Sequence, residues 1–316
     1  MKLDVVVPTY NRSGLLQSAI SSLLEAPIPS GLDVTIFVID NNSKDDTEEV
    51  VRKIETESAG RVRYVKETRQ GLSYARNTGI AAGSGDIIGF IDDDEEIDAQ
   101  WYTVIAREFA DPTTQFIGGP YLANCQTAMP SWLPPGYNGV IGVIEPKPRT
   151  VMNASFPGNL QGGNAVFRRA VFDQVGLFDL RLGRSDKGLL SEEDAELYRR
   201  LISANILGFH VPDLIIYHYI PASRLTRSYY RSWCYWRGVS HGIADKKKRE
   251  PAAYLLGLPR HRIRKAALGL AAMPLNLSPT RGEGPPFTRE LAFWDLLGFI
   301  RGKFFINIDN YYAREK

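Results

Sequence analysis

Residues 87–94 have the sequence IIGFIDDD, an apolar run that passes directly into three aspartates. The run Ile87–Ile91 is short and rich in apolar side chains, which predicts a buried strand of a parallel sheet. In sheets of this kind, ligands bind beyond the carboxyl ends of the strands. The position of Asp92, Asp93 and Asp94 therefore predicts a functional site at that edge.

Three similar apolar runs precede this strand, and helical patterns separate them. Strands are predicted over Leu3–Val7, Val34–Ile39 and Val62–Lys66, and helices over residues 15–24, Asp45–Ile54 and Tyr74–Ala82. This alternation predicts an α/β fold with a doubly wound, mostly parallel sheet. Polar clusters follow the first, second and fourth strands, and we expect them to meet at one edge.

The pattern changes after residue 100. We expect a proline-rich loop region over residues 117–165, helices at Trp101–Phe109, Val171–Val175 and Asp194–Ile202, and a strand at Val211–His218. A helical region from Leu225 follows, with a linker at Ser278–Pro286 and a last helix at Arg289–Phe305. The predicted division is a catalytic domain at residues 1–223 and a helical extension at residues 224–316.

Composition excludes several classes of protein. The chain has 316 residues, of which 44% are hydrophobic, so it can bury a substantial core and is not disordered. Its two cysteines exclude a disulfide framework and a cysteine-rich zinc site. There is no apolar run of about 18 residues, so no membrane span is predicted. The first residues lack a signal-peptide pattern, and we expect a cytoplasmic location.

The net charge of +2 conceals an asymmetry. Residues 224–316 hold 18 Lys and Arg against 7 Asp and Glu, whereas residues 1–223 hold 20 against 29. The basic, aromatic-rich region is consistent with peripheral binding to an anionic membrane, at the inner face of the plasma membrane. The alternative is that its apolar faces pack on the protein itself or form a homo-oligomer. No nucleic-acid partner is predicted.

Three adjacent carboxylates repel one another, and a bound cation relieves that repulsion. Mg²⁺ or Mn²⁺ suits a site made of carboxylate and diphosphate oxygens. The alternative is a solvated acidic loop that continues into Glu95, Glu96 and Asp98.

Six motifs resemble, in order and at similar spacing, those of family 2 inverting glycosyltransferases with the GT-A fold. They are Val5–Arg12, Val38–Thr47, Gly71–Gly79, Phe90–Asp94, Gly162–Asn164 and Glu192–Leu197. The fourth is similar to the family's metal-binding Asp-x-Asp motif, the fifth to its donor-sugar loop, and the sixth to the motif that holds its catalytic base. Together they cover roughly residues 3–220.

The resemblance implies a nucleoside diphosphate sugar donor and a role for each matching residue. Asp94 would bind the metal, with His218 completing its coordination, and Asp92 and Asp40 would contact the nucleoside. The remaining donor-binding residues would be Pro8, Thr9, Tyr10, Asn11, Gly71, Arg76, Asp93, Gly163 and Asn164. For Asp40 the alternative is a helix N-cap, and for His218 it is an ordinary structural histidine.

Asp194 is the predicted general base, with Glu193 beside it in the same motif. A carboxylate within hydrogen-bond reach can take the proton that an acceptor hydroxyl loses as it attacks. Glu192 and Glu193 would raise the pKa of that carboxyl by like-charge repulsion. The alternative is that these acids only favour a helix N-terminus.

The predicted function is therefore metal-dependent transfer of a sugar, from a UDP-sugar by default, to an acceptor hydroxyl. The acceptor implied by the family is a glycan or lipid-linked glycan in bacterial envelope or exopolysaccharide synthesis. One rival is a sugar-nucleotide nucleotidyltransferase, although residues 8–13 lack the glycine-rich phosphate loop it needs. The other is a non-catalytic module that binds an anionic surface.

Overall fold

The computed structural model describes residues 1–133, 136–183, 193–247, 249–272 and 285–306. The chain forms two compact units. The first comprises Met1–Asn124 and Val143–Tyr219, and the second comprises Cys125–Gly142 together with the described part of Ile220–Lys316. Residues 125–142, which fall in the predicted loop region, thus belong to the same unit as the C-terminal helices.

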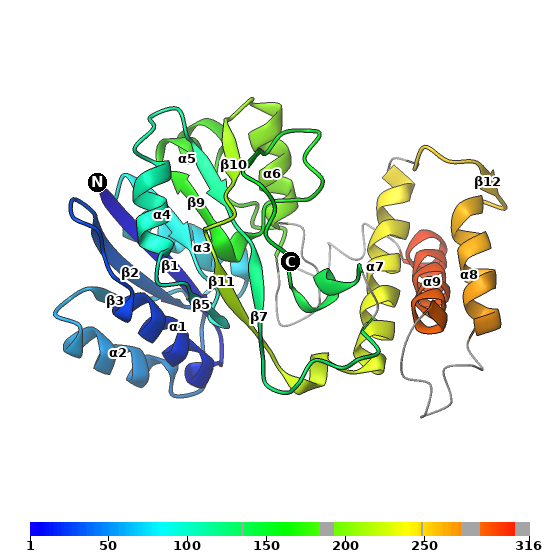
Figure 1. Ribbon diagram of the computed structural model, residues 1–316, viewed down its shortest axis with the longest axis horizontal. Coiled ribbons are helices and arrows are strands. Elements are labelled where there is room, and N and C mark those ends of the chain that lie inside the picture. The colour runs from blue at the N-terminus through cyan, green and yellow to red at the C-terminus, as the bar shows by residue number, and fades with distance from the viewer. Residues whose placement is uncertain (134–135, 184–192, 248, 273–284, 307–316) are drawn as a thin grey trace. The chain divides into compact units, whose positions relative to one another are not determined.

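The first unit is built on an eight-stranded sheet. Its strands are β1 (Lys2–Thr9), β2 (Asp33–Asp40), β3 (Val62–Lys66), β4 (Ile87–Phe90), β6 (Phe116–Gly118), β8 (Thr150–Val151), β9 (Ala165–Arg168) and β10 (Gly208–His210). The order is β3-β2-β1-β4-β9-β6-β10-β8, and the first four strands are parallel (Figure 1). β9 is antiparallel to both of its neighbours. The predicted α/β fold with a mostly parallel sheet is confirmed.

Helices cover both faces of this sheet, because successive side chains of a strand point to opposite sides. Val5 and Val7 of β1 lie in one apolar core with residues of α1 (Ser13–Glu25), α2 (Thr47–Glu57) and α4 (Trp101–Glu108). Val6 lies in a second core with residues of α3 (Leu72–Ala82), α5 (Ala170–Val175) and α6 (Glu193–Ser203). A strand that is buried on both faces is mainly apolar, which explains the valine run, and the buried Asp4 of β1 is paired with Arg169.

After the three aspartates that follow β4, the chain enters a second, three-stranded sheet. It consists of β5 (Glu95–Ile97), β11 (Ile216–Ile220) and β7 (Tyr121–Cys125), in that order with β11 in the middle. β11 runs antiparallel to β5 and pairs His218 with Glu95.

The predicted strand Val211–His218 is wrong, because β10 ends at His210 and β11 begins only at Ile216. The segment between them turns at Pro212 and Asp213, where the Leu214 amide donates to the carbonyl of Val211. Proline lacks the amide hydrogen that a sheet interior requires, and Pro-Asp is a turn-forming pair. His218 therefore lies in the middle of a strand and not at its end.

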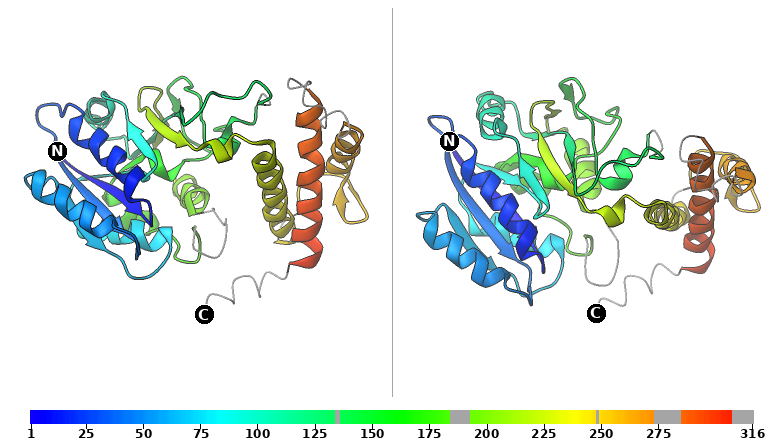
Figure 2. Two further views of the ribbon diagram at one scale, coloured as in Figure 1. Left: turned by 90° about the horizontal axis from the view of Figure 1, so that it is seen from below. Right: turned by 60° about the horizontal axis from the view of Figure 1, so that its bottom comes forward.

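The second unit is mainly helical. It contains the 3₁₀ turns η1 (Asn138–Ile141) and η3 (Ala222–Arg224), α7 (Arg227–Lys247), the hairpin β12 (Tyr254–Leu255) and β13 (Leu258–Pro259), α8 (Arg260–Ala272), α9 (Pro285–Ile300) and the π-helical turn η5 (Arg301–Phe305). α9 lies between α7 and α8 (Figure 1, Figure 2). Its buried side chains Phe287, Leu291 and Phe299 make α9 part of the core of this unit.

Glycines let α7 and α9 approach each other closely. A Cβ added at Gly238 of α7 would stand 2.0 Å from the carbonyl oxygen of Asp295. In the opposite direction, a Cβ at Gly298 of α9 would stand 1.8 Å from the carbonyl oxygen of Tyr235. Only glycine fits at such backbone-to-backbone contacts.

Several boundaries in the second unit differ from the sequence prediction. The last helix was expected at Arg289–Phe305, but α9 already begins at Pro285 and its continuation after Ile300 is π-helical. Residues 278–284 of the predicted linker lie outside the described part of the chain. The hairpin β12–β13 was not predicted, because its strands have only two residues each. No described helix is long and apolar enough to cross a membrane.

Candidate active site

The turns that follow β1 and β2 are tied together at the edge of the sheet. Asn11, whose φ is +53°, accepts a hydrogen bond from the Lys44 amide (2.6 Å) and donates its own amide to the Ser43 hydroxyl (3.0 Å). Pro8 and Thr9 are buried at the end of β1, whereas Tyr10 and Asn11 are exposed. The predicted donor-binding turn therefore presents only its last two side chains to solvent.

Asp40 ends β2 and is almost completely buried, with 1% of its surface exposed. One carboxylate oxygen accepts the Ser43 amide (2.8 Å), and the other accepts the Tyr64 hydroxyl (2.7 Å). Burial and the bond to Asp40 raise the pKa of the Tyr64 hydroxyl. The residue at the N-cap position of α2 is Asp46, so Asp40 closes a turn and is not a helix cap.

The three aspartates after β4 have different partners. Asp92 accepts the Arg76 guanidinium (3.1 Å). Asp93 accepts the Thr9 hydroxyl (2.9 Å) and the Arg12 guanidinium (2.9 Å), and the same Arg12 nitrogen contacts Asp94 (3.1 Å). Burial raises the pKa of Asp93 to about 6 despite its contact with Arg12. Arginine side chains thus neutralise much of the repulsion within the triplet.

Asp94 and His218 are the pair suited to a metal ion. Asp94 Oδ2 lies 3.9 Å from His218 Nε2, and both side chains are close to one-tenth exposed. Cation–ligand distances of about 2.1 Å would let one ion contact both atoms. The described residues contain no cluster of three or more His, Cys, Asp or Glu arranged to hold a metal. The pair therefore suits a cation whose other ligands come from a diphosphate or from water.

Arg76 lies in the interior and joins the predicted base to the acidic triplet. Its side chain is 1% exposed. The guanidinium contacts Asp194 at 2.6 Å, Asp92 at 3.1 Å and Glu193 at 3.5 Å. Residues far apart in sequence, on α3, on α6 and after β4, thus meet around one cation. Glu192 lies outside the described residues. Among the described groups, the Arg76 guanidinium contacts Asp194 directly, at 2.6 Å.

The loop Gly162–Asn164 passes so close to these acids that side chains are excluded. The Gly162 amide donates to the second oxygen of Asp194 (2.9 Å), and a Cβ at Gly162 would stand 2.3 Å from that carboxylate. A Cβ at Gly163 would stand 2.4 Å from the carboxyl of Glu95. Glu95 is buried, and this burial raises the pKa of its carboxyl well above the ordinary value.

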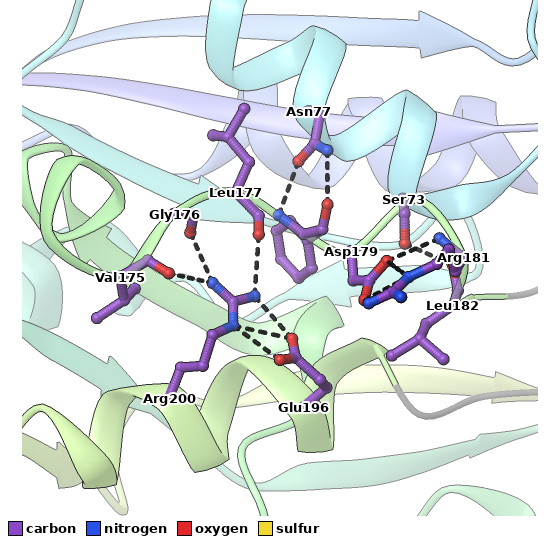
Figure 3. A network of polar contacts seen from close by, with 11 residues as sticks. Ser73, Asn77, Val175, Gly176, Leu177, Asp179, Arg181, Leu182, Glu196 and Arg200 are labelled. Atoms are coloured by element: carbon purple, nitrogen blue, oxygen red, sulfur yellow. Dashed lines mark hydrogen bonds and ion pairs between the residues drawn. The ribbon is translucent and has the colours of Figure 1, made fainter.

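A network of polar contacts fixes α3 relative to α6 (Figure 3). Both helices bond to the segment 175–182: Asn77 of α3 exchanges two hydrogen bonds with the backbone of Phe178, and Ser73 donates to the Leu182 carbonyl. On α6, Arg200 donates to three carbonyls of the same segment and is paired with Glu196. Because α3 carries Arg76 and α6 carries Asp194, this network holds the two groups at contact distance.

Two of the predicted donor-binding residues have structural contacts. Gly71 has a φ of +141° at the start of α3, and its amide donates to the Asn41 side chain (2.7 Å). Asn164 is completely buried. Its amide group donates to the carbonyls of Pro120 and Leu214 and accepts from the Trp101 indole.

Sequence analysis missed two residues of the site. Arg12 was quoted only as part of a motif, although it bridges Asp93 and Asp94. Its place in the turn after β1, next to β4 in the sheet, was the available signal. Glu95 was named only in the alternative of a solvated acidic loop, but it accepts the Asp92 amide and lies against Gly163. Nothing in the spacing of the acids indicates that burial.

Comparison with solved structures supports the fold. The chain is similar to a mannosyltransferase from Pyrobaculum calidifontis that was solved in complex with GDP-Man and Mn²⁺. The TM-score is 0.62 at 20% identity, over 96% of this chain and 87% of that one. A likeness at that identity supports the GT-A fold alone.

Two curated relatives match over different spans. The succinoglycan biosynthesis protein ExoM of Rhizobium meliloti is 23% identical over 78% of this chain and 76% of its own length. The GalNAc(5)-diNAcBac-PP-undecaprenol beta-1,3-glucosyltransferase of Campylobacter jejuni is 38% identical over 98 residues. That second match spans only 30% of either protein.

The family model for glycosyl transferase family 2 matches residues 4–176, which is more than half of the chain. The matched region contains the turns after β1 and β2, the acidic triplet, Arg76 and the loop Gly162–Asn164. The resemblance found in the sequence motifs is thereby confirmed, and the chain belongs to glycosyl transferase family 2.

Proposed function

We propose that the protein transfers a sugar from a nucleoside diphosphate sugar to an acceptor hydroxyl with inversion at the anomeric carbon. The turn Pro8–Asn11, Asp40 and Asp92 would bind the nucleoside and ribose of the donor. Gly163, on the loop that approaches Glu95 and Asp194, would lie beside the donor sugar. Family membership favours this function over a nucleotidyltransferase or a purely binding module.

Asp94 and His218 would hold the divalent cation, Mn²⁺ or Mg²⁺, together with the donor diphosphate. When bound, such a cation stabilises the negative charge that develops on the departing diphosphate. The separation of 3.9 Å between their ligand atoms supports this assignment. Arg12, which contacts Asp94, would lie near the diphosphate and could also contact its negative charge.

Asp194 would act as the general base. Each of its oxygens already accepts one hydrogen bond, from Arg76 or from the Gly162 amide, which leaves a lone pair on each for an acceptor hydroxyl. The hydroxyl oxygen would bond to the anomeric carbon as the bond to the diphosphate breaks, and its proton would pass to Asp194. One displacement without a covalent intermediate inverts the configuration.

The observation that carries this proposal is the contact of Arg76 with both Asp194 and Asp92. A guanidinium is rigid and planar, so it sets the base at a defined place relative to the acidic triplet. A donor held by that triplet would therefore meet the base in a fixed geometry. Such positioning of reacting groups is a main source of catalytic rate.

The donor proposed is a UDP-sugar, and the acceptor is a glycan or a lipid-linked glycan. The names of two relatives support this acceptor class. One is named for succinoglycan biosynthesis and the other for an undecaprenol-diphosphate-linked glycan. The GDP-Man complex of the similar mannosyltransferase makes GDP-sugars the first alternative to test.

The test is release of nucleoside diphosphate from a panel of UDP-, GDP- and dTDP-sugars with Mn²⁺ or Mg²⁺. We expect turnover of one donor, loss of turnover in EDTA, and recovery on adding the cation. Transfer to an acceptor, followed by NMR of the anomeric proton, tests inversion. Turnover in EDTA would refute the role of Asp94 and His218, and a retained configuration would refute the single displacement.

A further inference from the structure

Most of the described acidic side chains of the second unit are buried, and all of them are paired. Its four described acids all form ion pairs: Asp245 with Lys303, Glu250 with Arg262, Glu290 with Arg231, and Asp295 with Arg237 and Arg262. Asp245, Glu290 and Asp295 are buried. Among the described residues, each negative charge of this unit is therefore paired with a basic side chain and adds little negative charge to the surface.

Basic side chains remain outside. Lys246, Arg249, Arg260, Arg264 and Lys265 are all exposed, and none of the described acids forms an ion pair with them. Three of them lie on α8, where Arg260, Arg264 and Lys265 follow the hairpin β12–β13 directly. The surface of the second unit is thus positively charged along α8 and at the end where α8 begins.

The same end carries unusual apolar exposure. Among the described residues, six large apolar side chains are more than half exposed, and all six belong to the second unit. Leu255 and Leu256 of the hairpin are 51% and 90% exposed, and Phe304 and Phe305 of η5 are 51% and 78% exposed. The other two are Leu268 and Leu270 of α8.

The hairpin and η5 are in contact. Lys303 donates to the carbonyl of Gly257, and a Cβ at Gly257 would stand 3.2 Å from the Phe304 ring. Leu256 and Phe304 therefore belong to one apolar tip, which we define as Leu255, Leu256, Phe304 and Phe305. Arg249 and Arg260 flank the hairpin in sequence on either side.

We propose that this tip docks the protein on an anionic lipid bilayer. The leucines and phenylalanines of the tip enter the headgroup layer, and the basic side chains of α8 and Arg249 contact lipid phosphates. Apolar side chains surrounded by Lys and Arg suit the interface of an anionic membrane. A nucleic acid would satisfy the charges but would leave the leucines of the tip without a partner. Docking on a bilayer would bring the protein to a lipid-linked acceptor. That consequence rests on the proposed function, whereas the docking itself does not.

This docking differs from one in which the helix α9 would lie flat on the membrane along its length. The buried side chains of α9 face α7 and α8, so they are not available to lipid. The apolar tip, and not the side of α9, would therefore contact the lipid.

The experiment measures co-sedimentation of the full chain with vesicles of phosphatidylcholine, with and without phosphatidylglycerol, at 0.1 M and 0.5 M salt. The apolar variant is Leu255→Ser/Leu256→Asn, in which asparagine suits the positive φ of residue 256. The basic variant is Arg264→Glu/Lys265→Glu. Controls on the first unit are Leu177→Ser/Leu180→Ser, at 46% and 44% exposure the more exposed leucines of that unit, and Lys53→Glu/Arg63→Glu, which are also exposed.

We expect the wild-type chain and both controls to bind the anionic vesicles preferentially at 0.1 M salt, with weaker binding at 0.5 M. The basic variant should bind roughly tenfold more weakly or worse, because each Lys or Arg adds several-fold to the affinity for anionic lipid. The apolar variant should lose roughly tenfold at both salt concentrations. Circular dichroism checks that the variants are folded.

Equal binding of neutral and anionic vesicles, or variants that bind like the wild type, would overturn the proposal. Tighter binding to a short DNA duplex than to the anionic vesicles would also overturn it. Donor turnover in solution separates this test from that of the proposed function. A chain that turns over donor but ignores vesicles refutes the docking alone, and the reverse result refutes the transferase alone.

Discussion

At the scale of single residues, the site depends on arginines that contact acids. Arg76 and Arg12 each contact two members of the acidic triplet or the predicted base. Buried carboxylates near one another cannot all stay ionised without such partners. The two arginines differ in exposure, since Arg76 is inside the protein and the Arg12 side chain is 40% exposed. We therefore expect Arg12 to give way to a ligand and Arg76 to stay in place.

Asp194→Asn tests the base. Transfer should fall roughly 100-fold or more, because the amide cannot accept a proton at neutral pH. Donor affinity, measured by calorimetric titration, should change little, since Asp194 is not among the residues proposed to bind the donor. Near wild-type turnover at saturating acceptor would show that another group takes the proton. Asp173→Asn, the same change at an exposed acid of α5, is the matched control and should leave transfer unchanged.

Arg12→Ala tests competition for Asp94. The guanidinium occupies Asp94 Oδ2, the atom that faces His218. Without it, Mn²⁺ should bind the nucleotide-free protein several-fold more tightly, roughly threefold to tenfold for a partly exposed ion pair. Electron paramagnetic resonance of free Mn²⁺ measures this directly, without any turnover. Arg52→Ala, an exposed arginine of α2, serves as the control. Unchanged or weaker Mn²⁺ binding by Arg12→Ala would exclude competition.

At the scale of elements, one carboxyl at the end of β3 holds the middle of α3. Glu67 follows β3, is 5% exposed, and accepts hydrogen bonds from the Arg69 guanidinium and the Thr78 hydroxyl. The bond from Arg69 is the main reason that the pKa of Glu67 falls to about 2. α3 carries both Thr78 and Arg76, so this contact also supports the site.

Glu67→Gln should lower the free energy of unfolding at pH 7 by about 2 kcal/mol, as for a lost charged hydrogen bond. Because folding depresses the pKa of Glu67, its contribution is complete above the ordinary value of about 4.5 and is lost as the pH falls towards about 2. Urea unfolding at pH 7, 5 and 3.5 should therefore show a difference that is constant between the first two and smaller at the third. A pH-independent difference would contradict the shift. Glu49→Gln, on the exposed side of α2, is the control.

Packing of α7 against α9 depends on glycine. Gly298→Ala would place a Cβ 1.8 Å from the carbonyl oxygen of Tyr235, and a backbone atom cannot move aside cheaply. Thermal unfolding should show a loss of about 1–3 kcal/mol, the usual cost of overpacking. Gly139→Ala is the matched control in the same unit, because nothing lies within 4 Å of a Cβ there. Equal stability of the two variants would mean that the helices are not in close contact.

At the scale of the whole molecule, the chain contains two compact units, each with its own buried core. The second unit depends on α9, whose Phe287, Leu291 and Phe299 are buried. Trp132, far from α9 in the sequence, packs its ring against Tyr230 and Phe287 of the same unit. A three-layer arrangement of helices is destabilised when its middle layer is removed.

A chain that ends at residue 284 should therefore lose the structure of α7 and α8. Hydrogen exchange should show loss of protection in both helices, while β1 and β4 of the first unit stay protected. The control ends at Ile306 and keeps α9, and we expect normal protection there. Protected α7 amides in the shorter chain would show that α9 is not required for the second unit.

The sequence by itself determined the parallel sheet and the place of the acidic triplet. Strands β1, β2 and β4 are largely buried, so each appears as an apolar run, and the turns after them appear as polar clusters. These signals are local, and the motifs that carry the family resemblance lie within them. The strand predicted over Val211–His218 was wrong for an equally local reason, because Pro212 and Asp213 form a turn between β10 and β11.

Only the tertiary structure decided which acids the arginines neutralise. Arg76 and Asp194 are 118 residues apart, and Arg12 and Asp94 are 82 residues apart. Neither spacing has a periodicity that a helix or strand would impose. The close approach of α7 to α9 was likewise decided only by the tertiary structure. A glycine in a helix does not by itself show which backbone packs against it. Local pattern specifies elements, whereas pairing between elements depends on how the two cores pack.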